Sequence, residues 1–238
     1  TVDAAPLYIT EVFYRAVGAD TDLEWVELYN AGDTFVELAN YSLGAGGSDY
    51  TTSTFQFSPL LLAPGQTVVV GGPTSNADNG APSLDQTGTI SLQNAGTASD
   101  GVGLFFEEAA SLTAGSVPID SVVYGSPNTN SLIDESGSPA TALSPEVADG
   151  ESLVREGLTN VFAQNTSPQP NLPISVSSLS VTRGPNESTQ TFTVSGFGFD
   201  ANLDEIQLGT SLLNCTNVDL ETIECNLTAA TTQTGDVD

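Results

Sequence analysis

The stretch of sequence that decides the fold is Glu24-Trp25-Val26-Glu27-Leu28-Tyr29-Asn30. Successive side chains of a β-strand point to opposite faces, so Val26 and Leu28 fall on one face and Trp25 and Tyr29 on the other. Apolar residues on both faces predict a strand that is covered, at least partly, on both sides. We therefore expect other parts of the chain to pack against each face.

Two carboxylates in this stretch, Glu24 and Glu27, would be buried by such packing. A buried charge is costly unless it is paired or hydrogen-bonded. Arg15 and Arg155 are the only cationic side chains in this part of the chain. We expect a structural salt bridge or a backbone hydrogen bond for these acids, and a ligand site is the alternative.

Similar apolar or alternating runs recur along the first part of the chain, separated by turn signals such as Pro64-Gly65 and Asn94-Ala95-Gly96. No amphipathic helical pattern is sustained over three turns. Many short strands without crossover helices predict an all-β sandwich rather than a parallel sheet. The predicted strands are residues 7–14, 25–29, 35–37, 41–43, 54–57, 66–70, 89–92, 103–106 and 120–124.

The chain is expected to divide at a proline-rich connector. Residues 126–149 are polar and predict a long loop on the rim of the first domain, and residues 151–162 become more apolar again and close that domain. Pro168, Pro170 and Pro173 then predict a stiff, extended segment. The predicted domains are residues 1–171 and 172–238.

A second series of strands is predicted after the connector, at residues 174–181, 189–195, 205–208, 212–216 and 222–226. About 100 residues are usual for a complete seven-stranded sandwich, and this domain is shorter. Residues 234–238 carry a turn signal that leads toward a further strand. We therefore expect the second sandwich to lack its last strand.

Cys215 and Cys225 are the two cysteines of the chain and lie close together in the second domain. We expect a local disulfide, formed in an oxidising compartment, and two reduced buried thiols are the alternative.

Several segments together resemble bacterial lamin tail domains, which have an I-x-E-[VI] strand followed by an E-[WYF]-[VI]-E-[LI]-x-N strand. Ile9-Thr10-Glu11-Val12 resembles the first of these strands, and residues 24–30 resemble the second. Further similar segments follow in the family's order, at residues 36–43, 55–70, 120–125, 151–155 and 167–171. The resemblance covers about residues 7–171 and implies an immunoglobulin-like sandwich.

The second domain resembles the IPT/TIG family of immunoglobulin-like domains. The similar segments are residues 174–179, 192–199, 208–209 and 222–225, together with Cys215. The resemblance implies that the two cysteines lie on nearby strands and are bonded. The predicted fold class is thus two immunoglobulin-like β-sandwiches in tandem.

The charge balance restricts the partners of the chain. It has 30 acidic residues against three basic ones, for a net charge of −27, and all three basic residues are arginines. Such a chain repels phosphate backbones and anionic membrane surfaces, so we expect no nucleic-acid partner. No apolar run reaches 18 residues, so no membrane insertion is expected. The acidity favours solubility, and divalent-cation binding is the alternative.

The inventory of catalytic side chains is poor. The chain contains no His and no Lys, which removes Ser-His-Asp triads, most zinc sites and Schiff-base chemistry. Carboxylate chemistry of the glycosidase type remains, but nothing distinguishes one pair of acids from the others. We therefore predict no catalytic residues, no enzyme activity and no cofactor apart from calcium.

Two loops could bind calcium through oxygen ligands. The first contains Asp20 and Asp22; the second contains Asp200, Asn202 and Asp204 in a D-x-N-x-D arrangement. The second loop is not an EF-hand, because Glu205 stands where that motif needs Gly. Ordinary solvated acidic loops are the alternative for both.

The chain begins at Thr1 without a basic and apolar leader, as expected of a mature secreted protein after signal-peptide removal. We predict a non-catalytic structural or adhesive protein, extracellular or at the cell surface of a bacterium. Its partners would be other protein subunits, surface components or further copies of the chain in a filament built by strand donation. The alternative is a pair of accessory N-terminal modules of a larger secreted hydrolase, such as a nuclease or phosphatase.

Overall fold

The computed structural model describes residues 7–168 and residue 170, followed by the backbone of five strands between residues 175 and 227. The chain forms two compact units, Thr1–Leu172 and Pro173–Asp238. The described residues form strands joined by loops and three short 3₁₀ turns, so the prediction of an all-β chain is confirmed.

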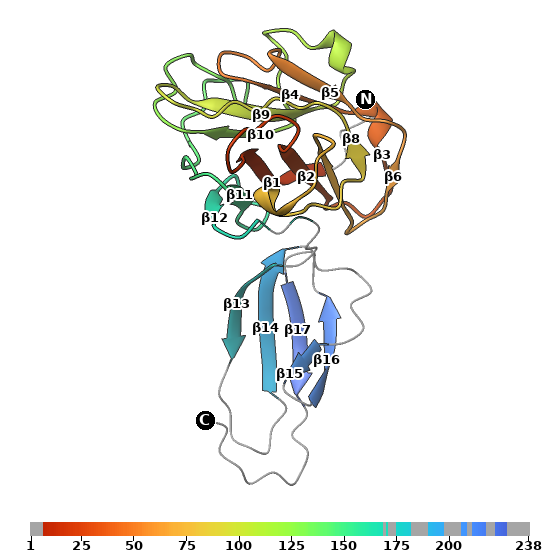
Figure 1. Ribbon diagram of the computed structural model, residues 1–238. Coiled ribbons are helices and arrows are strands. Elements are labelled where there is room, and N and C mark those ends of the chain that lie inside the picture. The colour runs from red at the N-terminus through yellow and green to blue at the C-terminus, as the bar shows by residue number, and fades with distance from the viewer. Residues whose placement is uncertain are drawn as a thin grey trace. The chain divides into compact units, whose positions relative to one another are not determined.

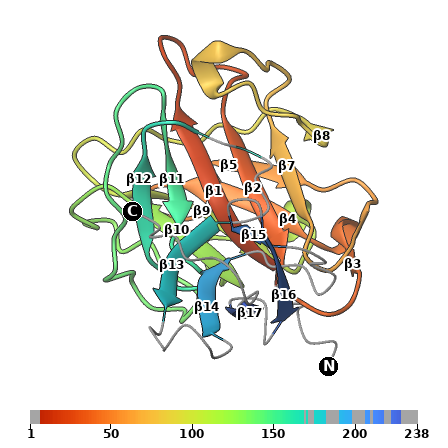
Figure 2. The ribbon, with the colours of Figure 1, turned by 90° about the horizontal axis from the view of Figure 1, so that it is seen from below.

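One layer of the first unit is a sheet with the strand order β12-β11-β1-β2-β7-β8. Its neighbouring strands are antiparallel except for the parallel pair β7 and β8. Figure 2 shows β12, β11, β1, β2 and β7 side by side in this layer. The strands are β1 (Leu7–Arg15), β2 (Trp25–Asn30), β7 (Thr67–Gly71), β8 (Gln86–Thr87), β11 (Glu151–Arg155) and β12 (Phe162–Asn165).

The other layer is an antiparallel sheet with the order β10-β9-β4-β5. It lies across from β1 and β2 in Figure 1. A separate pair, β3 with β6, closes one edge of the unit. The strands are β3 (Val36–Glu37), β4 (Ser42–Gly46), β5 (Ser53–Gln56), β6 (Leu61–Leu62), β9 (Asp100–Phe105) and β10 (Asp120–Tyr124), and the 3₁₀ turns are η1 (Leu38–Asn40), η2 (Ala77–Asn79) and η3 (Ala109–Ser111).

Strand β2 is buried along its whole length, which confirms that both of its faces are covered. Val26 and Leu28 belong to the main core between the two sheets. Trp25 belongs to a second cluster on the opposite face, where its ring stacks on Phe13 with 5.6 Å between the ring centroids. The alternating side chains of β2 therefore contribute to two hydrophobic clusters, one on each face of the strand.

The two sheets also make direct aromatic contact across the main core. Tyr14 of β1 stacks on Tyr124 of β10 with 4.0 Å between ring centroids. Both side chains are fully buried. Each hydroxyl has a backbone partner, since Tyr14 accepts from the Val147 amide and Tyr124 donates to the Gln93 carbonyl. This pair fixes the spacing of the layers without leaving an unpaired hydroxyl.

The predicted strand at residues 89–92 is wrong, because those residues lie outside any strand. Their backbone N–H groups are bonded to side chains instead of to a neighbouring strand. Ser91 N–H donates to Ser53 Oγ at 3.0 Å, and Leu92 N–H donates to Glu24 Oε2 at 3.0 Å. Ile90 and Leu92 are buried in the main core, so the alternating apolar residues mark buried side chains in a segment that does not pair as a strand.

The long loop predicted at residues 126–149 is present and is anchored at several points. Leu132, Ala140 and Val147 are buried. The Asn128 amide donates to the carbonyls of Leu132 and Ala140, which closes the loop on itself. The loop therefore forms a cover over β10 and its neighbours.

The second unit contains one described sheet, in the order β13-β14-β17-β16-β15, visible in the lower part of Figure 1. Within it, Cys215 of β16 is the direct register partner of Cys225 of β17. The expected absence of a last strand concerns residues outside the described ones. The strands are β13 (Ser175–Val181), β14 (Gln190–Phe197), β15 (Ile206–Leu208), β16 (Ser211–Asn217) and β17 (Thr222–Leu227).

Candidate functional site

Asp20, predicted as a calcium ligand, lies in the turn between β1 and β2 and is half-buried. Its carboxylate accepts from the Ala16 N–H at 2.9 Å and from the Asn94 side-chain amide at 2.5 Å. The Asp20 carbonyl accepts from the Leu23 N–H, which closes the turn. The Asp20 carboxylate is thus held by one donor from its own turn and one from a distant part of the chain.

Asp22, the other predicted ligand of this loop, has a positive φ of 64°, which an aspartate tolerates better than most residues. Its carbonyl accepts from the Thr74 N–H at 3.0 Å. Gly72 lies so close that a Cβ there would be 2.5 Å from the Asp22 Cα atom. The structure gives Asp22 a role in the turn, and its predicted role as a ligand remains untested.

No group of three or more acidic or cysteine side chains able to hold a metal occurs among the residues that the structure describes. The other predicted ligands, Asp200, Asn202 and Asp204, lie outside those residues. Calcium binding at either loop therefore remains a prediction.

Glu24 is only 4% exposed, and its Oε2 atom accepts from the Leu92 N–H. Of the salt bridge or backbone hydrogen bond expected for this buried acid, the structure shows the backbone hydrogen bond. Its other oxygen, Oε1, has no hydrogen-bond partner. Burial raises the pKa of the Glu24 carboxyl to about 8, and the negative charge of Asp20 adds to the rise.

The other acids of the β1–β2 pair are held by hydroxyl groups. Glu27 accepts from Thr10 Oγ1 at 2.6 Å. Glu11, its register partner on β1, accepts from the hydroxyl of Ser152 and from the Asn165 amide. These bonds tie β2 to β1 and β1 to β11 and β12, which is a structural use of the acids.

Both arginines of the first unit pair with acids outside the strand Trp25–Asn30. Arg155 donates to both carboxylate oxygens of Asp120, at 2.7 and 2.5 Å, in a fully buried pair. Arg15 pairs with Glu146 at 2.6 Å and with Asp149 at 2.8 Å near the surface. The first pair is in the interior, and the second clamps the long loop to the end of β1.

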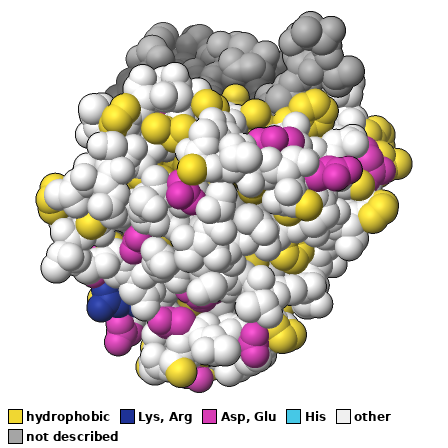
Figure 3. All heavy atoms as spheres, turned by 90° about the horizontal axis from the view of Figure 1, so that it is seen from above, with side chains coloured by type: hydrophobic (Ala, Val, Ile, Leu, Met, Phe, Trp, Pro, Cys, Tyr) yellow, Lys and Arg dark blue, Asp and Glu magenta, His cyan; other side chains and the backbone are white. Residues whose placement is uncertain are grey.

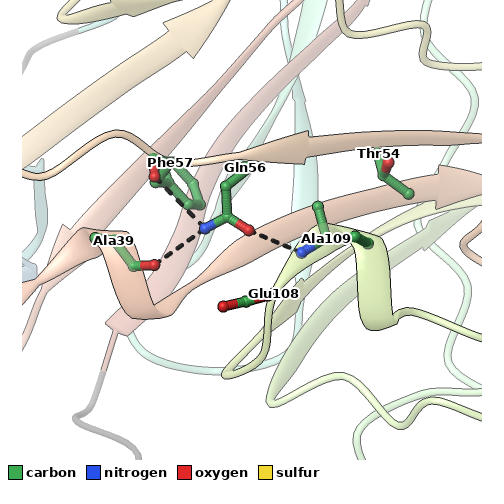
Figure 4. Close-up of a pocket in the computed structure, with 7 residues that line it drawn as sticks. Ala39, Thr54, Gln56, Phe57, Glu108 and Ala109 are labelled. Carbon is green, nitrogen blue, oxygen red and sulfur yellow. Dashed lines mark hydrogen bonds between the residues drawn. The ribbon is translucent and has the colours of Figure 1, made fainter.

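A groove of about 610 Å³ lies between η1, β5 and η3. Figure 4 shows Gln56 among the lining residues, hydrogen-bonded to Ala39 on one side and to Ala109 on the other. The Gln56 amide donates to the carbonyls of Ala39 and Tyr41, and its oxygen accepts from the Ala109 N–H. The groove is lined by Ala39, Thr54, Gln56, Phe57, Glu108, Ala109 and Ala110.

Exposed apolar side chains lie on and directly beside the adjoining β3–β6 strand pair. Phe35 is 66% exposed and Leu61 is 62% exposed. Leu61 pairs with Glu37, two residues from Phe35, so the two apolar side chains share one face. The sequence predicted neither this face nor the groove, because both depend on where distant loops meet.

The surface of the first unit is predominantly neutral and acidic. Figure 3 shows a face on which acidic side chains are scattered among polar ones, with basic colour confined to one place. This agrees with a composition of 30 acidic and three basic residues. A partner of this surface would therefore be neutral or basic rather than anionic.

Comparison with known proteins gives one match. The Lamin Tail Domain family matches residues 2–126, more than half of the 238 residues. The chain belongs to the lamin tail domain family. No curated protein and no solved structure matches the sequence.

Lamin tail domains are immunoglobulin-like interaction modules without a catalytic role. The matched part of this lamin tail domain ends just after β10, so the resemblance at residues 151–155 and 167–171 lies beyond it. Nevertheless β11 and β12 extend the same sheet next to β1. Among the described residues, no helix is long and apolar enough to span a membrane.

Proposed function

We propose that this chain is a non-catalytic structural or adhesive protein of an extracellular or cell-surface assembly in a bacterium. Membership of the lamin tail domain family, a family of interaction modules, is the observation that carries this proposal. The absence of His and Lys from the sequence supports it, because the common nucleophilic and metal-dependent mechanisms need those residues.

The groove between η1, β5 and η3 is the contact region that we assign to this role. The Gln56 side chain in its lining is held by hydrogen bonds to Ala39, Tyr41 and Ala109, which connect the two sides of the groove without a ligand. Phe35 and Leu61 expose apolar side chains close to the groove, since β3 directly precedes η1 in the chain and η1 borders the groove. A preformed hollow beside exposed apolar side chains is suited to a protein partner.

A binding experiment with a matched pair of variants tests this assignment. Ala110→Arg places a long cationic side chain in the groove, whereas Ser111→Arg places the same side chain on the same turn outside it. The chain, labelled at its N-terminal amine, is measured on whole cells of the producing organism. We expect saturable binding that only Ala110→Arg weakens, by tenfold or more. Equal binding by both variants would exclude the groove, and no saturable binding would contradict the adhesive role.

The second unit is proposed to be an IPT/TIG-like domain with a Cys215–Cys225 disulfide, within domains of residues 1–171 and 172–238. The direct register pairing of the two cysteines supports the bond, because opposite residues of antiparallel strands have Cα atoms about 4.5–5.5 Å apart. This spacing lies within the range that disulfides need.

Filament formation by strand donation is a further form of the structural role. In the described sheet of the second unit, β13 and β15 are the outer strands, where an added strand would pair. Sedimentation velocity at increasing concentration distinguishes this form, since a filament subunit grows beyond a dimer. A single monomeric species at all concentrations would contradict it.

The second candidate function is that of accessory modules in a secreted hydrolase such as a nuclease or phosphatase. Both functions predict no turnover of nucleic acid or phosphate ester by this chain alone. A hydrolase domain encoded in the same gene would favour the accessory function. Turnover by the purified chain would contradict both.

A further inference from the structure

A second feature of the first unit lies away from the groove, where two acids meet the segment Leu92–Asn94. Glu24 Oε2 accepts from the Leu92 N–H at 3.0 Å, and Asp20 accepts from the Asn94 side-chain amide at 2.5 Å. Leu92 and Asn94 are two residues apart, and the bond from the Leu23 N–H to the Asp20 carbonyl closes the turn between the two acids, so both carboxylates contact the same short segment. The effect of the Asp20 charge on the pKa of Glu24 agrees with this proximity.

The segment across these acids is fixed at three successive residues. Between the contacts of Leu92 and Asn94, the Gln93 carbonyl accepts from the hydroxyl of Tyr124 at 2.8 Å. Tyr124 is fully buried and stacks on Tyr14. The position of Asn94 opposite Asp20 is therefore set by the core.

The negative charge at this place has no cation to balance it among the described residues. Arg15 and Arg155 are engaged with other acids, and the sequence has no lysine. Glu24 is 4% exposed, and its Oε1 atom is buried without a hydrogen-bond partner. Such an oxygen is costly in the interior unless it accepts a proton, a hydrogen bond or a cation.

We propose that Glu24, Asp20 and Asn94 form a binding site for a divalent cation of the calcium type, with ligands that are all oxygen. Glu24 contributes Oε1, and Asp20 contributes the oxygen that now contacts Asn94. A half-turn of the Asn94 amide replaces its NH₂ group by its oxygen, so the same residue changes from donor to ligand. Waters complete the coordination of the ion.

Asp22 is not part of this site, although the sequence suggested it together with Asp20. This difference provides a control, because Asp22→Asn and Glu24→Gln each replace a carboxyl group by an amide, at positions two residues apart. Two carboxylates and one amide are few ligands, so we expect an affinity of about 0.1–1 mM, the range of extracellular calcium modules. The site does not depend on the proposed adhesive role.

Thermal unfolding of the full chain, after dialysis against EDTA, tests the site. With calcium chloride at 10 to 100 times the dissociation constant, we expect the Tm of the wild type and of Asp22→Asn to rise by about 3–10 °C. Glu24→Gln should lose this rise. Potassium chloride at the same ionic strength should give no comparable rise in any of the three proteins.

Two outcomes overturn the proposal. One is a wild type whose Tm calcium does not raise above the potassium chloride control. The other is a rise of equal size in Glu24→Gln, which would place the ion elsewhere. If Glu24→Gln fails to fold, Asn94→Ala takes its place, and calorimetric titration with calcium chloride should show a Kd at least fivefold weaker than that of Asp22→Asn. An unchanged Kd in Asn94→Ala would overturn the assignment equally.

Discussion

Arg155 on β11 and Asp120 on β10 form a buried ion pair that joins the two sheets of the sandwich, with 2.5 Å between Nη2 and Oδ2. Ile9 completes the arrangement, since its N–H donates to Asp120 and its carbonyl accepts from Arg155. The register of β1 against β2 shifts between Ile9 and Glu11. The ion pair thus serves as the hydrogen-bonding partner of Ile9 at this irregularity.

The rings of Tyr8 and Phe162 flank the guanidinium of Arg155, at 5.5 and 4.6 Å from its central carbon to the ring centroids. Burial raises the pKa of the Asp120 carboxyl, while the Arg155 charge and the Ile9 N–H oppose the rise. Removing one partner would leave the other charge buried and unpaired.

The first prediction concerns this pair. Asp120→Asn and Arg155→Met should each lower the free energy of unfolding by about 3–5 kcal/mol, because each leaves an uncompensated buried group. Urea unfolding of the full chain, followed by the fluorescence of Trp25, measures the change. The matched control is Arg15→Met, whose ion pairs are partly exposed and should contribute no more than about 1 kcal/mol. Equal losses for Arg15 and Arg155 would show that burial does not decide the effect.

The second prediction concerns Asn79, a fully buried residue at the end of η2. Its amide donates to the carbonyls of Leu23 and Thr74 at 2.9 Å, and its own carbonyl accepts from the Trp25 indole at 2.9 Å. Asn79→Ala leaves these two carbonyls without their donor and the Asn76 N–H without its acceptor, and should lower the free energy of unfolding by about 2–4 kcal/mol in urea.

The hydrogen bond from the Trp25 indole to the Asn79 backbone carbonyl distinguishes two explanations for such a loss of stability. The backbone carbonyl of residue 79 survives the substitution, so the Trp25 emission maximum should stay that of a buried indole. A red-shifted maximum in native Asn79→Ala would mean that the turn has opened, beyond the loss of the three side-chain hydrogen bonds.

The third prediction is a pH dependence caused by Glu24 in the presence of EDTA. Its pKa is about 8 in the folded chain against an ordinary value of 4.5, so between these values the folded state holds a proton that the unfolded state has released. The free energy of unfolding should therefore fall as the pH rises from 4.5 to 8, and level off above 8. The contribution is roughly 3–5 kcal/mol over the whole window.

Glu24→Gln removes this contribution because an amide does not titrate. The difference in stability between the wild type and the variant should therefore move in favour of the variant as the pH rises from 5 to 8.5. A difference independent of pH would mean that Glu24 titrates near its ordinary pKa.

The fourth prediction is the Cys215–Cys225 disulfide. The intact chain should have a mass lower by two hydrogen atoms than the reduced chain and should resist alkylation until a reductant is added. A loop of this length is expected to contribute about 2–3 kcal/mol, which the Cys215→Ser, Cys225→Ser double variant would lose. Alkylation of both thiols in the native, unreduced chain would contradict the bond.

The strands with the strongest alternation were predictable from the sequence. Residues 25–29 became β2, and residues 120–124 are β10, because burial on one or both faces leaves a direct trace in the order of apolar residues. Residues 89–92 have the same trace but bond to Ser53 and Glu24, which no local pattern reveals. Alternating apolar residues therefore predict which side chains are buried more reliably than they predict which segments pair as strands.

The candidate sites were less predictable, since they depend on contacts between distant residues. Asp120 and Arg155 each lie in a segment that resembles the family, but nothing in either segment says that they meet. Asn94 became relevant only when the structure placed it against Asp20, 74 residues earlier. The unpaired oxygen of Glu24 likewise depends on which backbone amide reaches its partner oxygen.

The ion pairs of the two arginines also affect how well the first unit resists proteolysis. Proteases of the trypsin type cut after lysine or arginine and need a mobile, exposed segment. The first unit offers them only Arg15 and Arg155, and both end strands of the same sheet with their side chains held by acids. Cleavage must therefore await local opening, and such proteases would remove this unit slowly.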